Sequence, residues 1–155
     1  MTDHVATNQG PFAGTRPSYG GPGEIVVVKL HVDMGDVKAA LGAVVASGDN
    51  IQIWNIPIGT LILGSLLKVT TVEGEACTCA LGDNAGVGTY IVAGTNLNSA
   101  TTIVGTAVGD TYGLAHKIYA SADTLDVLFG GGSVDIATAV FDVYVYCIIN
   151  QDVGY

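Results

Sequence analysis

The residues that come closest to a catalytic device lie in the last third of the chain. His116 is followed by Ser121, Asp123 and Asp126, which are the residue types of a Ser-His-Asp hydrolase. The G-x-S-x-G segment that exposes a nucleophilic serine in one large class of hydrolases does not occur in the sequence. Ser133 lies in the segment GGGSVD, which is better explained by a hairpin turn. The sequence therefore assigns no catalytic residue and predicts a protein that is not an enzyme, with a hydrolase using His116 as an alternative.

Residue types that bind metal ions are equally sparse. His31 and Asp33 lie two positions apart on a predicted strand and therefore share one face. Asp83 and Asn84 lie in a glycine-rich turn that could surround Ca²⁺, although Asp and Asn before glycine are common in turns and the EF-hand spacing is missing. Residues 86–88 lack the lysine and the third glycine of a phosphate-binding loop. We therefore expect neither a metal ion nor a cofactor.

The cysteines favour a structural role. Cys77 and Cys79 lie two positions apart on a predicted strand, where the backbone is poorly shaped for a disulfide, and Cys147 is the third. Their odd number and the lack of a signal peptide in residues 1–10 predict free, buried thiols in a reducing compartment.

The composition points to a protein with partners. Hydrophobic residues make up 49% of the chain and charged residues only 12%, whereas a typical soluble domain carries about 25% charged residues. Much of the surface must therefore be covered by other subunits or by small neutral side chains, and a permanent oligomer is the simpler explanation. The uncharged stretches 50–67 and 84–109 are too rich in Asn, Gly and Thr for membrane-spanning helices.

The net charge of −9 excludes two classes of partner. Nucleic-acid binding requires clustered Lys and Arg side chains. The five cationic residues are scattered along the chain: Arg16, Lys29, Lys38, Lys68 and Lys117. An anionic membrane surface would repel the chain for the same reason. We therefore expect binding to neither nucleic acid nor membrane.

Residues 1–23 differ from the rest of the chain. They are rich in proline and glycine and poor in aliphatic residues, so they cannot bury enough apolar surface to order themselves. Phe12, Arg16 and Tyr19 are spaced singly within this segment, as contact residues of an extended arm would be. The segment is either a loose tail or an N-terminal arm that lies on a partner, and these three residues are the predicted contacts.

Residues 24–155 are predicted to form one all-β domain. Short alternating apolar runs separated by turns predict about eight to nine strands, which indicates an antiparallel β-sandwich. The predicted strands span residues 25–33, 51–56, 61–72, 76–81, 89–93, 112–119, 124–129 and 138–149, with a further weak strand within 94–109. One short helix is expected at 36–45, capped by Asp36.

The last predicted strand alternates with a two-residue period. Phe141, Val143, Val145, Cys147 and Ile149 share one face, and Val140, Asp142, Tyr144, Tyr146 and Ile148 share the other. A solvated second face should be polar. Because this one is largely apolar and carries two tyrosines, a residue type enriched in interfaces, we assign Tyr144, Tyr146 and Ile148 to an oligomer interface.

Two segments within about residues 49–150 resemble small structural proteins of tailed bacteriophages. They are IPIGTLILGSLLKVTTVEGEACTCALGDN and KIYASADTLDVLFGGGSVDIATAVFDVYVYCI. The family pattern is IP-x-G-T, then V-x-V-T-T, which this chain matches as LKVTT, then L-G-D, and then ADTLD before a final hairpin. Such proteins include capsid decoration, or cement, proteins, many of which are trimers with jelly-roll-like bodies and arms that reach over the major capsid protein. The resemblance covers no part of residues 1–23.

The resemblance implies a virion component that is assembled in the host cytoplasm. The expected function is that of a homotrimeric decoration protein that binds and stabilises the shell of the major capsid protein. Two alternatives stay open at this point: another phage structural component, such as a head fibre base, neck or tail protein, and a carbohydrate-binding β-sandwich module.

Overall fold

The computed structural model describes residues 3–5, 25–83, 91–100, 102–105, 118–133 and 135–149. Within them lies one helix, α1 (Met34–Leu41). The strands are β1 (Asp3–Val5), β2 (Ile25–Asp33), β3 (Asn50–Ile56), β4 (Thr60–Thr71), β5 (Thr78–Gly82), β6 (Ile91–Asn96), β7 (Thr102–Gly105), β8 (Asp123–Gly130) and β9 (Val140–Ile149). The predicted arm contacts Phe12, Arg16 and Tyr19 lie outside the described residues.

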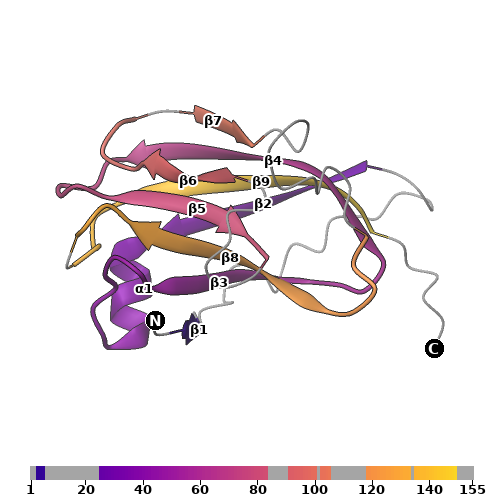
Figure 1. Ribbon diagram of the computed structural model, residues 1–155, viewed down its shortest axis with the longest axis horizontal. Coiled ribbons are helices and arrows are strands. Elements are labelled where there is room, and N and C mark those ends of the chain that lie inside the picture. The colour runs from indigo at the N-terminus through magenta and orange to yellow at the C-terminus, as the bar shows by residue number, and fades with distance from the viewer. Residues whose placement is uncertain are drawn as a thin grey trace.

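The strands form a two-layer sandwich (Figure 1). One sheet has the order β1-β3-β8-β5-β6 and the other has the order β2-β9-β4-β7. From β2 to β9 the chain alternates between the two sheets at every step except β5 to β6, which are antiparallel neighbours. This order of eight strands is that of a jelly roll. The predicted all-β, jelly-roll-like antiparallel sandwich is confirmed.

β1 stands apart from this pattern. It pairs with β3 in parallel, from Asp3 opposite Asn50 to Val5 opposite Gln52, whereas the other strand pairs in the described part of the chain are antiparallel. The three residues of β1 lie within the segment predicted to be an arm, so part of that segment covers the edge of the five-stranded sheet.

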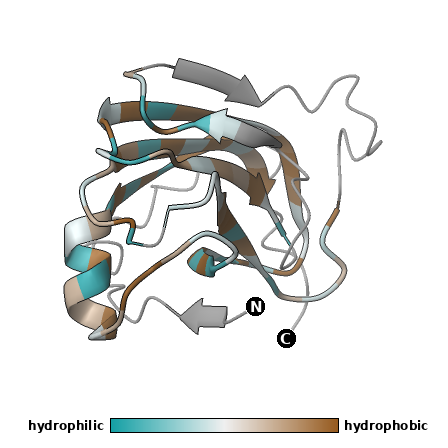
Figure 2. Ribbon diagram, turned by 60° about the vertical axis from the view of Figure 1, so that its left-hand side comes forward, coloured by the Kyte–Doolittle hydropathy of each residue, from teal (hydrophilic) through white to brown (hydrophobic). Residues whose placement is uncertain are grey.

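The core lies between the inward faces of the two sheets. Aliphatic side chains dominate it, together with Phe129, Phe141, Tyr119 and the three free thiols of Cys77, Cys79 and Cys147. Figure 2 shows hydrophobic colouring along the strands and a mixture of polar and apolar residues on α1. The predicted burial of all three cysteines is confirmed.

β9 lies between β2 and β4 in the four-stranded sheet. Its inward side chains are those predicted from the two-residue period, and Phe141, Val143, Val145 and Cys147 are all buried. They lie opposite Val32, Leu30, Val28 and Val26 of β2. The long alternating run at the C-terminus is therefore a central strand, buried on one face and paired along both edges.

β-bulges interrupt the alternation of side chains along β3 and β4. The register of β3 shifts between Gln52 and Trp54, which brings Ile51 and Trp54 onto the same inward face, opposite Val127 and Leu125. Strict alternation over residues 51–56 would place Ile51 and Trp54 on opposite faces, and the extra residue of the bulge reverses that alternation. A bulge between Ile62 and Gly64 likewise makes Ile62 and Leu67 inward-facing, with Leu61 outward.

The helix begins two residues earlier than predicted. Asp33 is its N-cap, with extended backbone angles and a side chain that accepts from the backbone N–H groups of Gly35 and Asp36. Asp36 lies in the first turn, where its negative charge interacts favourably with the positive end of the helix dipole. The predicted cap at Asp36 and end at residue 45 are wrong, since Gly42 ends the helix in a left-handed conformation.

The segment between β8 and β9 is not the predicted hairpin. β8 belongs to the five-stranded sheet and β9 to the four-stranded sheet, so the chain crosses from one layer to the other between them. Gly131 and Gly132 have positive φ angles of 91° and 89°, a region that favours glycine, and they start this crossing. Ser133 therefore lies in a connection between layers.

Candidate assembly surface

The outward face of the four-stranded sheet carries the residues assigned to an interface. Tyr144, Tyr146 and Ile148 alternate along β9 on the face opposite to the core. Tyr146 is exposed, while Tyr144 and Ile148 are half-buried. We call the outward residues of β2, β4 and β9 the outer sheet face.

A row of four aliphatic side chains crosses this face at the end farther from α1. Ile25 of β2 lies opposite Ile148 of β9, and Ile148 lies opposite Leu61 of β4. Leu61 in turn forms an antiparallel bridge with Ile118. Directly opposed residues of antiparallel strands project from the same face of a sheet. We call Ile25, Ile148, Leu61 and Ile118 the aliphatic row.

A second row adjoins the first one. Val27 of β2 lies opposite Tyr146 of β9, which lies opposite Gly64 of β4. Exposed fractions are 63% for Ile25, 65% for Ile118, 48% for Val27 and 38% for Tyr146. The described residues contain seven large hydrophobic side chains that are exposed, and four of them gather in these two rows. Clustered apolar exposure of this kind marks an interaction surface more often than scattered single residues do.

The other half of the outer sheet face is charged. The Asp142 carboxylate on β9 accepts from Lys29 Nζ at 2.9 Å and from His31 Nδ1 at 2.7 Å. Lys29 also lies over the ring of Tyr144, 5.5 Å from its centroid. Lys68 of β4 is paired opposite Asp142 in the sheet register. The outer sheet face therefore has an apolar half and a polar half, as an interface with a polar rim does.

The pKa values of this group follow from its contacts. Burial raises the pKa of Asp142, but the hydrogen bonds from His31 and Lys29 and their charges bring its pKa below the ordinary value. The hydrogen bond to Asp142 raises the pKa of Lys29. The ionised carboxylate is thus held by two donors on the neighbouring strand, which fixes its position on the face.

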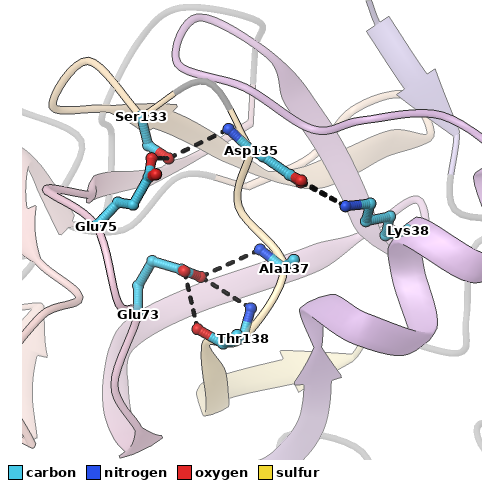
Figure 3. A network of polar contacts seen from close by, with 7 residues as sticks. All are labelled: Lys38, Glu73, Glu75, Ser133, Asp135, Ala137 and Thr138. Atoms are coloured by element: carbon cyan, nitrogen blue, oxygen red, sulfur yellow. Dashed lines mark hydrogen bonds and ion pairs between the residues drawn. The ribbon is translucent and has the colours of Figure 1, made fainter.

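A second polar group lies at the α1 end of the sandwich, where the chain twice crosses between the sheets (Figure 3). Glu73, in the β4–β5 connection, is buried, and its Oε2 accepts from the backbone N–H groups of Ala137, Thr138 and Ala139 at 3.0–3.2 Å. Its Oε1 accepts from the hydroxyl of Thr138 at 2.8 Å. Burial raises the pKa of Glu73, yet these hydrogen bonds outweigh burial and leave its pKa below the ordinary value.

Further contacts hold the same corner. Ser133 Oγ donates to Glu75 at 3.1 Å, and Lys38 Nζ of α1 donates to Asp135 at 2.8 Å (Figure 3). The Asn98 side chain accepts from the backbone N–H of Cys77 and donates to the carbonyl oxygens of Glu73 and Glu75. We call these residues, with Glu73, the corner network. The polar groups of the corner network bond to one another, so the network has the arrangement of one that stabilises the fold.

The structure does not bring the candidate metal residues together. His31 contacts Asp142, whereas the Asp33 carboxylate turns to the start of α1. Asp83 is buried and accepts from the hydroxyl of Tyr119 at 2.8 Å, while Asn84 lies outside the described residues. Among the described residues, no group of three or more His, Cys, Asp and Glu side chains could hold a metal ion.

The described candidate hydrolase residues differ in their burial and in their hydrogen-bond partners. His116 lies outside the described residues, and Ser121 is exposed. Asp126 is buried and accepts from Asn50 Nδ2 at 3.0 Å, and Asp123 accepts from the backbone N–H of Thr124.

In the described part of the chain no helix is long and apolar enough to cross a membrane.

Sequence reasoning missed most of the apolar surface. It identified the outward residues of β9 but not the partners that β2, β4 and Ile118 place beside them. The signal was present in Ile25 and Val27, which alternate with the inward residues of β2. Their contribution depends on which strand becomes the neighbour of β9, and that pairing joins residues at opposite ends of the chain.

Comparison with known proteins rests on structure alone. A scan against protein-family models finds no match, and a search of curated proteins finds none. The fold is similar to that of a chain in the capsid of Ralstonia phage GP4, with a TM-score of 0.69 and 12% sequence identity, covering 97% of this chain and 100% of that chain.

Two further solved structures share the fold. A chain from the capsid asymmetric unit of cyanophage Pam1 gives a TM-score of 0.52 at 17% identity, covering 88% of this chain and 95% of that chain. A chain from the acidic stable capsid structure of Helicobacter pylori bacteriophage KHP30 gives 0.51 at 9% identity, with coverages of 81% and 87%. The jelly roll of this chain is therefore a fold that occurs in phage capsids.

Proposed function

We propose that this chain is a structural component of a phage virion, and more narrowly a capsid decoration protein that binds and stabilises the shell of the major capsid protein. The observation that carries the proposal is the whole-chain structural likeness to a chain of the Ralstonia phage GP4 capsid. The alignment covers 97% of this chain and 100% of that chain, so the likeness extends over the whole sandwich.

Three properties of the chain support a role without chemistry. The two described aspartates of the candidate hydrolase set, Asp123 and Asp126, accept hydrogen bonds within the fold, Asp126 from Asn50 and Asp123 from the backbone N–H of Thr124. The corner network uses its charged groups to join segments of the two sheets. Among the described residues, four of the seven exposed large hydrophobic side chains gather on one half of the outer sheet face. Sheet faces of this type bind other proteins.

The proposed assembly is a homotrimer with Tyr144, Tyr146 and Ile148 in the contact between subunits. An N-terminal arm would bind the capsid through Phe12, Arg16 and Tyr19. β1 pairs with the edge of β3, so the first residues of the chain would anchor the start of the arm and leave the rest to reach the shell. The protein would then be found in the virion, assembled in the host cytoplasm.

The test uses empty heads of the phage whose genome encodes the chain, prepared without this protein. Purified full-length chain is added and the heads are sedimented. Co-sedimentation to saturation at a fixed number of copies per head is expected, with regular added density on the shell in electron micrographs. Density at a single vertex, or only on tails, would instead place the protein in the neck, tail or fibre.

A matched pair of variants separates the arm from the body. Alanine at Phe12, Arg16 and Tyr19 together is expected to reduce head binding and leave thermal unfolding unchanged, because these residues belong to the proposed arm and not to the proposed sandwich domain. Alanine at Ser47, an exposed turn residue of the body, is the control and is expected to bind normally. Equal binding by both variants would move the capsid contact to the body. Failure of the unaltered chain to bind heads, together with hits on a glycan array, would favour a carbohydrate-binding module.

A further inference from the structure

β2 forms one edge of the four-stranded sheet. In the described chain it pairs with β9 over all nine of its residues and with no other strand, and the register of this pairing has no shift. The other sheet edges in the described chain are shorter: β1 has three residues, β7 has four, and β6 has six and pairs with β5 in a register that shifts. We call the side of β2 that faces away from β9 the β2 edge.

The β2 edge has the backbone properties of a template for a further strand. In an antiparallel pair, about half of the N–H and C=O groups of each strand point to its neighbour, and in an edge strand the other half point outward. Proteins protect such edges with proline, bulges, short strands or charged residues. β2 contains Lys29 but lacks the other protective features, and five of its residues are Ile or Val, which favour an extended backbone.

The core is incompletely covered along the first half of this edge. Val26 and Val28 face inward, opposite buried residues of β9. Both valines are half-buried, whereas the next inward residues of β2, Leu30 and Val32, are only 1% and 5% exposed. A strand added beside β2 would cover Val26 and Val28 with its own inward side chains, and the burial of apolar surface would favour its binding.

The outward side chains of β2 indicate the charge of such a strand. Lys29 and His31 both contact Asp142, yet 52% of the Lys29 side chain and 57% of the His31 side chain stay exposed, so a further acidic group can reach them. Lys68 is paired opposite Asp142 from the other side, so two lysines surround one carboxylate here. On a chain with a net charge of −9, this position attracts an acidic partner where most of the surface would repel it.

From these observations we infer that the β2 edge binds an extended segment of the major capsid protein, which joins the four-stranded sheet as an additional antiparallel strand. The segment alternates apolar side chains, which cover Val26 and Val28, with acidic side chains opposite Lys29 and His31. The inference rests on the proposed function for the identity of the partner, and it adds the place and the mode of the contact. Because the proposed arm ends at residue 23 and β2 begins at Ile25, the two contacts with the shell adjoin, and the outer sheet face stays available for the proposed contact between subunits.

A peptide tests the mode of binding without phage heads. The probe is the synthetic peptide VEVEVTVT, whose valines would face the core and whose glutamates would lie opposite His31 and Lys29 in an antiparallel pairing. At a peptide concentration about ten times the dissociation constant, the amides of alternate β2 residues are expected to exchange with solvent about tenfold more slowly in NMR spectra, because only the unbound fraction exchanges. No binding, or binding without this alternate protection, would overturn the addition of a strand.

A second peptide tests the charge of the partner. VKVKVTVT keeps the valines and replaces both glutamates by lysine, so that like charges lie opposite Lys29. It is expected to bind about threefold or more weakly than the glutamate peptide at low salt, and the difference should shrink at high salt as screening increases. Equal or tighter binding of the lysine peptide would overturn the acidic character of the partner segment.

Empty heads test the identity of the partner. Val26→Lys is expected to raise the dissociation constant for heads roughly tenfold or more, because the added strand would bury an unpaired ammonium group. Val44→Lys makes the same change of charge at an exposed position after α1 and should bind like the unaltered chain. Thermal unfolding checks the fold of each variant. The glutamate peptide should also displace the unaltered chain from heads, a measurement that needs no variant.

These outcomes separate the inference from the proposed function. Equal head binding by folded Val26→Lys and Val44→Lys, or failure of the glutamate peptide to displace the chain, would overturn the inference and leave the capsid role standing. An unaltered chain that binds the peptide with alternate protection but ignores heads would overturn the proposed function, and with it the capsid protein as the partner.

Discussion

Glu73 accepts two hydrogen bonds from Thr138, one from its backbone N–H at 3.0 Å and one from its hydroxyl at 2.8 Å. The two residues lie 65 positions apart in the chain, one after β4 and the other just before β9. Both connections cross between the sheets, so a single carboxylate ties the two crossings together. It also satisfies the N–H groups of Ala137 and Ala139, which would otherwise be left without partners near the core.

Replacing Glu73 by Gln is expected to destabilise the fold by about 2–4 kcal/mol, because an amide removes the charge and turns donors toward backbone N–H groups. Chemical denaturation measures the change. Glu75→Gln is the control. Glu75 is exposed, and within the corner network its carboxylate accepts one hydrogen bond, from Ser133. This substitution should therefore cost less than about 1 kcal/mol of stability. Equal losses in both variants would contradict the role given to Glu73.

Acid is expected to destabilise the protein through Glu73 and Asp142. Both carboxyls have pKa values below their ordinary 4.5 and 3.8, so the unfolded chain binds protons more readily than the folded one. Their contribution to stability is present above the ordinary values and is lost as the pH falls through and below them. Unfolding free energies measured from neutral to acidic pH should fall in that window, and less steeply in Glu73→Gln. An identical pH profile in that variant would exclude Glu73 as a source.

Gly131 and Gly132 provide a second matched pair. Both have positive φ angles, but an added Cβ at Gly131 would lie 2.9 Å from the carbonyl oxygen of Ala76 and 3.1 Å from Cys77 Cα, whereas at Gly132 nothing lies within 4 Å. Gly131→Ala is expected to cost about 2–4 kcal/mol from strain and collision, and Gly132→Ala about 1 kcal/mol from strain. Denaturation midpoints check the order, and a reversed order would contradict the packing of β5 against this crossing.

The cysteines are expected to resist alkylation in the folded protein. Burial raises the pKa of Cys79 to about 12 and the pKa values of Cys77 and Cys147 to about 11, so little reactive thiolate forms near the ordinary thiol value of 9.0. Mass spectrometry after treatment with iodoacetamide should find unmodified native chain and three adducts after denaturation. Rapid labelling of Cys79 in the native state would contradict its place in the core.

Local alternation in the sequence predicts the strand faces best where no bulge interrupts it. The period of two along 140–149 predicted the inward and outward faces of β9, because that strand has no bulge. Alternation alone does not predict the bulges after Gln52 and after Ile62, where one added residue reverses the faces of the side chains that follow. Asp33 and Asp36 are both plausible helix caps, and only the backbone geometry at Asp33 separates them.

The pairing of distant residues lay beyond the sequence pattern. Nothing near Glu73 indicates that its partners are Ala137 to Ala139, since the contact depends on two crossings meeting at one corner. The aliphatic row is the same kind of feature, assembled from three strands and a bridge. Both arise from topology, which a single chain's local periodicities do not specify.

The position of β9 also has a consequence for the order of events during synthesis. In the described chain β2 has β9 as its sheet neighbour, with Ile25 opposite Ile148, so the first strand of the jelly roll must wait for the last one to leave the ribosome. Pairings this distant in sequence form slowly. The aliphatic row does not exist before β9 inserts between β2 and β4. A truncated or half-folded chain therefore lacks the proposed contact surface, and we expect only finished molecules to assemble.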